Sequence, residues 1–341
     1  VRTGRPVTVS SVIATLRGDD PKRGMWVMSS HYDDCDGNCT DVTGDAPGAD
    51  DNASAVSAVL EAARVLASSH PHATIAFIAF DGEDQGLWGS AHYAKTLRAQ
   101  NARVEGDLNN DIVGASVAHD GHSVADEVRL FSEALPAGSS LRAVNLIGTE
   151  NDSPSRELAR AVAAIDAAYV PAMHDELIYR AGRFLRGGDQ ESFTAEGYPA
   201  VRFVEGAENF DHQHQNVRVE NGVQYGDLAR FLDFDYLARV TQLNVAALAT
   251  LALAPAAPSA SIVAKKLGYD TTLTWNAVPE AASYEVLWRR TDEPAWSHAT
   301  NVGNVTTATL PLSKDDWLFG VRSVDAEGHA SVAAFPTPLL R

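Results

Sequence analysis

The sequence is poor in cysteine. Its 341 residues include only two, Cys35 and Cys39, which lie together in the segment CDGNC. Two cysteines this close can be half of a metal site, a redox pair or a local disulfide. A thiolate metal site usually needs further Cys or His at suitable spacing, and a redox pair usually reads CxxC. We therefore expect a small-loop disulfide and, with it, an oxidising compartment, extracellular or periplasmic.

Basic residues and long apolar runs are also scarce. The chain has 27 Lys and Arg against 45 Asp and Glu, so its formal net charge is −18. Nucleic acids and anionic membrane surfaces both attract clustered Lys and Arg, so we expect neither as a partner. The best candidate for a membrane span, Val245–Ala254, is shorter than the ~20 residues required. The chain begins at Val1 without a signal-peptide pattern, so we expect a mature or trimmed secreted product.

The first three quarters of the chain alternate between predicted strands and helices. Met25–Ser30 and Thr74–Phe80 are short apolar runs without polar alternation, which is typical of strands covered on both faces. Between them, Ala53–Ser69 carries apolar residues at helical spacing, with Asp51 or Asn52 at the expected N-cap. This alternation predicts a three-layer α/β/α fold around a mostly parallel central sheet. Ligands of such sheets gather at the carboxyl ends of the strands.

The composition changes at a Pro/Ala segment, APAAPSA. After it, the chain reads as short strands separated by turns, which is typical of an all-β sandwich. We therefore place the α/β domain at residues 1–254, a linker at 255–258 and the sandwich at 259–341. Through LTWNAVPEAASYEVLWR and LFGVRSVDAEGHAS, the last segment resembles a fibronectin type III domain. Contacts across such linkers are usually few, so we expect the sandwich to be dispensable for chemistry in the first domain.

Polar and acidic side chains cluster where the predicted strands of the first domain end. The members of this set are His31, Asp33, Asp51, Glu83, Asp84, Asp111, His212 and His214. Converging carboxylates repel one another unless a cation lies between them. Mixed His and carboxylate ligands suit Zn²⁺, whereas Ca²⁺ and Mg²⁺ prefer oxygen ligands alone. A set this large can hold two metal ions ~3.5–4 Å apart.

Five motifs, in this order, resemble the secreted di-zinc aminopeptidase family, the co-catalytic zinc exopeptidases that include bacterial leucyl aminopeptidases. The motifs are HYDD, APGADDNAS, FDGEDQGLWGS, NNDIVG and GYPAVRFVE, and the resemblance covers nearly all of residues 8–254. It implies two Zn²⁺ ions per chain and a catalytic Glu83, which acts as general base on a metal-bound water.

The resemblance also implies a role for each polar residue of the set. His31 and Asp111 would bind one zinc, Asp84 and a late histidine the other, and Asp51 would bridge both. Asp33 would hold the imidazole of His31 through its carboxylate.

Three positions depart from the family pattern. The family usually has Glu where this chain has Asp84, and it has Asp-His where this chain has Asp189-Gln190. The late histidine is ambiguous, because HQHQN offers His212 and His214 two residues apart. Residues two apart in an extended segment point the same way, so the sequence leaves both open.

Together these observations predict a secreted metallo-aminopeptidase that removes N-terminal residues from peptides or proteins. An acidic site attracts a free α-ammonium group, which favours this activity over carboxypeptidase action. The alternatives are a glutaminyl cyclase-like or carboxypeptidase activity on the same scaffold, or a receptor-like relative without catalysis. Protein or carbohydrate surfaces are the expected partners of the C-terminal sandwich.

Overall fold

A mostly parallel seven-stranded sheet forms the centre of the first part of the molecule. The computed structural model describes residues 6–339 except 42, 136–138, 185 and 266. The strand order in the sheet is β1-β3-β2-β4-β7-β5-β6. The strands β3, β2, β4 and β7 are parallel, and β1 and the β5–β6 pair run antiparallel to their neighbours β3 and β7. The strands are β1 (Val12–Leu16), β2 (Met25–His31), β3 (Thr74–Phe80), β4 (Val104–Asn110), β5 (Glu127–Ser132), β6 (His174–Ile178) and β7 (Ala200–Glu205).

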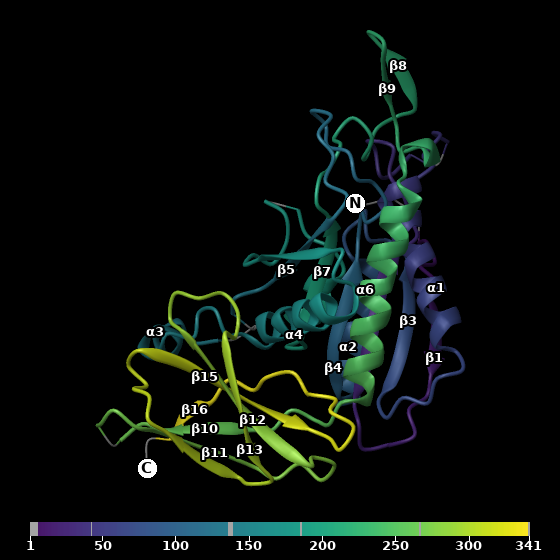
Figure 1. The fold of residues 1–341 in the computed structure, drawn as a ribbon. Coiled ribbons are helices and arrows are strands. Elements are labelled where there is room, and N and C mark those ends of the chain that lie inside the picture. Colours follow the sequence, from purple (N-terminus) through teal and green to yellow (C-terminus); the bar gives the residue numbers. More distant parts are fainter. Residues whose placement is uncertain (1–5, 42, 136–138, 185, 266, 340–341) are drawn as a thin grey trace.

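Helices cover both faces of this sheet, as predicted (Figure 1). Within β2, Met28 belongs to the core under α1, α4 and α6, whereas Val27 belongs to the core under α2 and α5. Apolar residues are therefore needed on both sides of the strand, which explains the absence of polar alternation. The helices are α1 (Ala55–Leu66), α2 (Trp88–Ala99), α3 (Leu141–Ile147), α4 (Pro154–Tyr169), α5 (Gln190–Ala195) and α6 (Phe234–Leu253).

The longest helix, α6, is a core helix. By length and composition alone it is long and apolar enough to cross a membrane. The apolar run Val245–Ala254, considered in the sequence analysis, covers only its C-terminal half. It packs against α1 and α4, and Val240, Leu243 and Leu248 are fully buried there. Its apolar character is thus accounted for by the core that it completes.

The C-terminal part consists of two sheets packed face to face around one core. Their strand orders are β14-β11-β10-β16 and β13-β12-β15. Leu273 and Trp275 from one sheet meet Tyr284 and Phe319 from the other in this core. The short strands separated by turns that the sequence predicts after the linker are present. The strands are β10 (Ala260–Val263), β11 (Thr271–Trp275), β12 (Ser283–Arg290), β13 (His298–Gly303), β14 (Thr307–Leu310), β15 (Trp317–Val324) and β16 (Thr337–Leu339).

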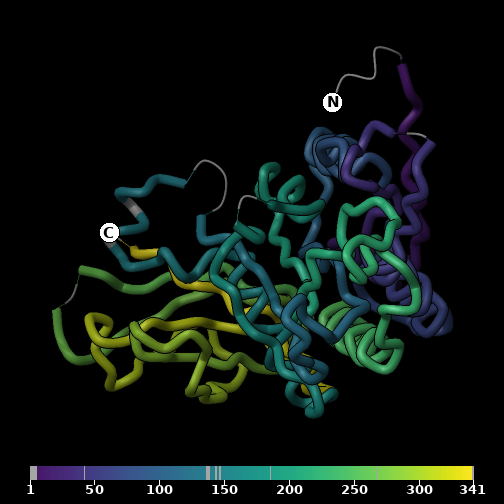
Figure 2. The backbone as a smooth tube through the Cα atoms, turned by 90° about the horizontal axis from the view of Figure 1, so that it is seen from above, coloured from purple at the N-terminus to yellow at the C-terminus, as the bar shows by residue number. Residues whose placement is uncertain are grey.

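Buried ion pairs join the sandwich to the α/β part, and Figures 1 and 2 show the two parts side by side. Arg289 of β12 donates from Nη2 to Asp152, and Arg160 of α4 lies 3.2 Å from the same carboxylate oxygen. These three side chains are at most 2 % exposed. Trp296 Nε1 donates to Glu157 Oε2 at 2.8 Å. The expectation of few contacts across the linker is therefore wrong, because charges this deeply buried require close packing around them.

The interface lies at the amino ends of the strands. A cavity of about 510 Å³ remains between the two parts, lined by residues that include Trp26 at the start of β2 and Val104 at the start of β4. The carboxyl ends of the same strands are at the opposite edge of the sheet. Hence the sandwich contacts the α/β part away from that opposite edge.

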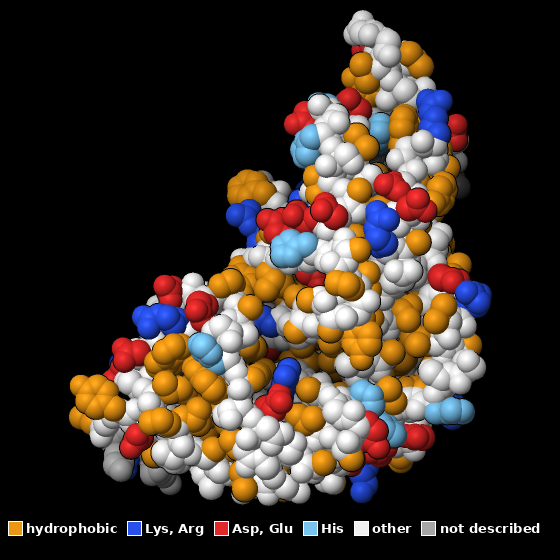
Figure 3. All heavy atoms as spheres, in the orientation of Figure 1, with side chains coloured by type: hydrophobic (Ala, Val, Ile, Leu, Met, Phe, Trp, Pro, Cys, Tyr) orange, Lys and Arg blue, Asp and Glu red, His pale blue; other side chains and the backbone are white. Residues whose placement is uncertain are grey.

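The surface carries the acidic excess of the sequence. On the face drawn in Figure 3, Lys and Arg side chains lie scattered and do not gather into one patch. Phosphate backbones bind where such side chains cluster, and this face offers no such cluster. The expectation that nucleic acid is not a partner stays a prediction.

We predict that Arg289→Ala destabilises the protein by about 3–5 kcal/mol, since it removes one partner from a buried ion network. Urea unfolding followed by tryptophan fluorescence measures the change. Arg290→Ala is the matched control, because Arg290 is 55 % exposed and lies 3.7 Å from Asp292. Loss of such an exposed pair costs about 1 kcal/mol or less. Equal effects of the two substitutions would contradict the prediction.

Candidate metal centre

Three neighbouring parallel strands bring the predicted site residues together at their carboxyl ends. His31 is the last residue of β2, and Asp111 follows the last residue of β4. Glu83 and Asp84 lie in the turn after β3. His214 arrives from the loop after β7, with a backbone φ of 51°. This is the edge where the fold predicts a ligand site.

Asp51 is held by backbone contacts rather than by a helix-cap role. It lies in the segment η1 (Ala49–Ser54), where its own backbone is not helical (φ −103°, ψ 86°), and its N–H donates to Asp227 Oδ2 at 2.7 Å. Asn52 donates from Nδ2 to a backbone oxygen at the end of β4 at 3.1 Å. The expectation that Asp51 or Asn52 caps α1 is wrong, because Ser54 occupies the N-cap position. The Asp51 carboxylate therefore faces the site.

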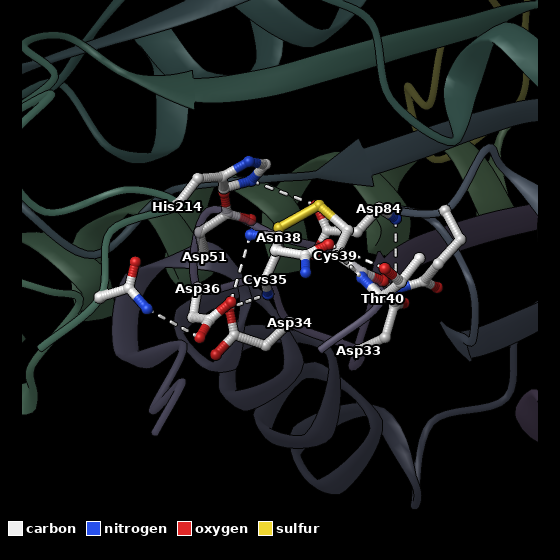
Figure 4. Close-up of a disulfide and its surroundings, with 12 residues drawn as sticks. Asp33, Asp34, Cys35, Asp36, Asn38, Cys39, Thr40, Asp51, Asp84 and His214 are labelled. Carbon is white, nitrogen blue, oxygen red and sulfur yellow. Dashed lines mark hydrogen bonds and ion pairs between the residues drawn. A yellow bond between two sulfur atoms is a disulfide. The ribbon is translucent and has the colours of Figure 1, made fainter. Parts of the chain in front are cut away.

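Asp51 lies between two pairs, each of one histidine and one further carboxylate. His31 Nε2 is 3.2 Å from Asp51 Oδ1 and 3.7 Å from Asp111 Oδ1. His214 Nε2 is 2.9 Å from Asp51 Oδ2 and 3.1 Å from Asp84 Oδ1 (Figure 4). Each oxygen of Asp51 thus serves a different histidine. This is the arrangement that a carboxylate bridging two metal ions requires.

The site draws positive charge strongly. Burial alone would raise the pKa of Asp51, yet hydrogen bonds from His214 and His31 lower that pKa well below its ordinary value. Burial alone would lower the pKa of His214, but hydrogen bonds to Asp51 and Asp84 raise that pKa to about 10. The pKa of His31 is raised well above its ordinary value against burial, by hydrogen bonds to Asp111 and Asp51. The carboxylates therefore favour a cation at each imidazole, and a metal bound there would take the place of a proton.

The donor set fits zinc. Two imidazoles and three carboxylates are the ligands that catalytic zinc sites use. Among the residues that the structure describes, Asp84 Oδ2 is buried without a hydrogen-bond partner, so the site leaves one carboxylate oxygen for a further cation. Residues that would hold zinc are therefore His31, Asp51, Asp84, Asp111 and His214.

Glu83 differs from these five residues because no hydrogen bond or ion pair holds its carboxyl group in the described part of the chain. Burial raises the pKa of Glu83 well above its ordinary value, and although His31 opposes this rise, nearby Asp111 adds to it. A carboxyl group without a fixed partner beside a metal centre can accept and return a proton.

Asp33 positions the Glu83–Asp84 turn. Its carboxylate oxygens accept the backbone N–H groups of Glu83 and Asp84, each at 3.1 Å. The expectation that this carboxylate holds His31 needs correction, since Asp33 Oδ1 lies 3.7 Å from His31 Nδ1. The backbone oxygen of Asp33, at 3.1 Å, is the partner of that ring nitrogen instead.

Arg202 is a site residue that the sequence analysis missed. It is fully buried in β7, with Nη2 at 2.7 Å from Asp111 Oδ2. Burial would raise the pKa of Asp111, but the Arg202 guanidinium and His31 lower it to about 2. Gly188 lies close by, where an added Cβ would be 2.8 Å from Asp111 Oδ2. The signal in the sequence was a single arginine inside the strand segment AVRFVE, which is apolar apart from Arg202 and its terminal Glu205.

The structure separates the two candidate late histidines. His214 contacts Asp51 and Asp84, as described above. His212 stacks on Phe231 with ring centroids 3.7 Å apart and belongs to none of the ligand clusters in the described part of the chain. The predicted disulfide between Cys35 and Cys39 is present.

A family model described as peptidase family M28 matches residues 11–233. The chain belongs to this family. Among its M28-like relatives, a protein of Leptosphaeria maculans named as a probable zinc metalloprotease is 46 % identical over 339 residues, which cover 98 % of this chain and 79 % of the relative. A protein of Pyricularia oryzae with the same description is 44 % identical over 350 residues, which cover 99 % of this chain and 70 % of the relative. Membership of this peptidase family makes the chain a hydrolase of peptide bonds, and the relatives above are named as probable zinc metalloproteases.

Two solved structures confirm the M28 fold. An aminopeptidase from Aneurinibacillus sp. superposes with a TM-score of 0.50 at 24 % identity, covering 70 % of this chain and 47 % of that one. The LapA aminopeptidase of Legionella pneumophila superposes with a TM-score of 0.51 at 22 % identity. The superposition covers 71 % of this chain and 54 % of that one. This chain spans about half the length of these two proteins, and the likeness concerns the fold alone.

We predict that His214→Ala loses one equivalent of bound zinc and at least ~10²-fold of peptidase activity. Changes to groups that merely support a ligand already cost 10–100-fold, so loss of a ligand should cost no less. His212→Ala is the matched control and should keep its zinc and its activity. Metal analysis after gel filtration measures the difference. Equal zinc loss in both variants would show that His212 also binds.

Proposed function

We propose that the chain is a di-zinc aminopeptidase that releases N-terminal residues from peptides and proteins. The observation that carries the proposal is the position of Asp51, which offers one oxygen to each of two histidine–carboxylate pairs. A single metal ion would leave one of these pairs without a cation. Two ions satisfy both pairs, with Asp51 as the shared ligand.

In this proposal, His31 and Asp111 would hold one zinc, Asp84 and His214 would hold the other, and Asp51 would be a ligand of both. When bound, zinc polarises the scissile carbonyl and lowers the pKa of a bound water toward neutrality. The chain supplies the geometry for this chemistry.

Three groups of the chain support the reaction around these ligands. Glu83 takes the proton from the attacking water and returns it to the leaving amine. Asp33 sets the direction of the Glu83 side chain through the backbone of the turn. Arg202 keeps Asp111 Oδ2 engaged, so Oδ1 alone faces the metal.

The charge around the site supports N-terminal recognition. Burial raises the pKa of Asp34 to about 6, with Asp51 and Asp84 adding to the rise. Burial likewise raises the pKa of Asp227 to about 7, with Asp50 adding. The contributions of the neighbouring carboxylates to these shifts indicate a negative potential at this edge of the sheet, which would attract the α-ammonium group of a peptide.

Carboxypeptidase action is the second candidate, and Arg186 is the observation that favours it. No ion pair engages its guanidinium in the described part of the chain. Burial and the charge of Arg183 lower the pKa of Arg186, and the negative charge of Asp51 opposes this fall. An arginine in this position can bind a peptide carboxylate. Glutaminyl cyclase-like action on one zinc is less well supported, since both histidine–carboxylate pairs are complete.

Four versions of one short peptide test the proposal: free at both ends, blocked at the N-terminus, blocked at the C-terminus, and starting with Gln. An aminopeptidase should cleave the C-terminally blocked peptide. It should cleave the N-acetylated peptide at a rate at least ~10²-fold lower. Cleavage of the N-acetylated peptide from its free carboxyl end would instead establish a carboxypeptidase. Cyclisation of the Gln peptide would establish a cyclase, and no turnover by a zinc-loaded chain would establish a receptor-like relative.

We predict that Glu83→Gln retains its zinc while kcat falls ~10²-fold or more, the usual scale for loss of a general base. The amide keeps the size of the side chain but cannot accept the proton. Glu61→Gln on the exposed side of α1 is the control and should leave kcat unchanged. Near-normal turnover by a zinc-loaded Glu83→Gln protein would remove Glu83 from this role.

We also propose a secreted protein with a fibronectin type III-like C-terminal module. The Cys35–Cys39 disulfide supports an oxidising compartment. Support for the module comes from a four-stranded and a three-stranded sheet that share one core around Trp275. The assigned ranges 1–254, 255–258 and 259–341 stay predictions.

A further inference from the structure

The Cys35–Cys39 disulfide lies directly against one half of the metal centre. A sulfur of each cysteine, a carboxylate oxygen of Asp84 and a ring nitrogen of His214 all lie within 4.8 Å of one another (Figure 4). Cys35 is buried, with 4 % of its surface exposed. Sequence spacing could not reveal this, since Asp84 and His214 are far from the cysteines along the chain.

These four groups have the composition and size of a structural zinc site. Cys35 and Cys39 are spaced C-x₃-C, within the C-x₂₋₄-C range of such sites. Zinc with sulfur and nitrogen ligands at 2.3 and 2.0–2.1 Å has ligand–ligand edges of about 3.3–3.8 Å. His214 Nε2 and Asp84 Oδ1 are already 3.1 Å apart. The covalent bond between Cys35 and Cys39 prevents the two sulfurs from acting as thiolate ligands.

The cysteine loop is anchored on both sides by contacts that do not involve the disulfide. Asn216, two residues after His214, donates from Nδ2 to Asp36 Oδ2 at 3.0 Å. Gln85, which follows Asp84, donates from Nε2 to the Cys39 backbone oxygen at 3.2 Å. These contacts tie the loop to the segments that carry the other two ligands. Reduction would free the sulfurs without removing the contacts that hold the loop in place.

We propose that reduction turns this half of the centre into a closed Cys₂-His-Asp zinc site, in which Cys35 and Cys39 take the places of Asp51 and of the open position beside Asp84 and His214. Structural zinc sites have four protein ligands, whereas catalytic sites keep one position open. The disulfide therefore keeps the metal at Asp84 and His214 accessible to water and substrate. This last consequence rests on the proposed peptidase function, but the thiolate site itself does not.

The conversion balances with an external dithiol as the reductant. The Cys35–Cys39 bond breaks, the two electrons come from the dithiol, and the dithiol becomes a disulfide. Its two protons appear on the two cysteine thiols. When the metal binds, each thiol loses its proton to solvent as a sulfur–metal bond forms. A peptidase regulated in this way would be inactive in a reducing compartment and active after oxidation.

The full chain loaded with Co²⁺ in place of zinc tests the proposal. Thiolate–cobalt bonds give a near-ultraviolet charge-transfer band that carboxylate and imidazole ligands do not give. We expect no band from the oxidised chain and a band from one thiolate-bound Co²⁺ per chain after reduction with a thiol-free phosphine. The double variant Cys35→Ser, Cys39→Ser should show no band in either state.

A chain that shows two titratable thiols and native far-ultraviolet circular dichroism, yet no band, would overturn the proposal. Should the reduced chain unfold, Cys35→Ala gives a second test, because its remaining thiol needs no reduction to face the metal. The folded Cys35→Ala chain should show a weaker band, and its absence would equally overturn the proposal.

Peptidase assays separate this proposal from the proposed function. The activity of the parent chain should fall at least ~10-fold on reduction, whereas that of the double serine variant should not respond to the reductant. A band on reduction from a chain that is inactive when oxidised would uphold the thiolate site and reject the peptidase. Activity without a band on reduction would uphold the peptidase and reject the thiolate site.

Discussion

Several carboxylates buried at one edge of a sheet are stable only when positive charge lies among them. Asp51 and Asp111 meet this requirement in the structure through His31, His214 and the guanidinium of Arg202. The pKa values of both histidines are raised for the same reason, because the neighbouring carboxylates favour a cationic imidazole and outweigh the opposite effect of burial. A divalent metal satisfies the demand more fully than two protons. The chemistry proposed for this M28 chain follows from that charge requirement.

The fold concentrates these groups because parallel strands end together. β2, β3 and β4 are neighbours in the sheet, and each contributes a ligand or general-base candidate just where it ends. At the amino ends of the same strands, a buried ion pair between Arg289 and Asp152 joins the sandwich to the α/β part. The catalytic edge is left free, and the opposite edge carries the contact with the second part of the chain. Stability and chemistry thus reside at different ends of one sheet.

Much of this arrangement could be predicted from local sequence. Thr74–Phe80 matches β3, because a run apolar on both faces has few alternatives in an α/β fold. His31 and Asp111 could be placed at the site because they follow such strands. The helix-cap reading of Asp51 was wrong, since local preference does not account for the contact with Asp227.

Long-range contacts could not be predicted. His212 and His214 are two residues apart, and contacts distant in sequence distinguish them: His212 stacks on Phe231, whereas His214 contacts Asp51 and Asp84. Arg289 and Asp152 are 137 residues apart, so no local sequence pattern predicts their contact. The disulfide was predictable from spacing, but its position against Asp84 was not.

The central claim is that one carboxylate, Asp51, bridges two zinc ions. Anomalous X-ray diffraction at the zinc absorption edge, on crystals of the oxidised, zinc-loaded chain, tests it most directly. The account predicts two peaks ~3.5–4 Å apart, one beside His31 and Asp111 and the other beside Asp84 and His214. A single peak at full zinc occupancy, or two peaks that do not share Asp51, would contradict it.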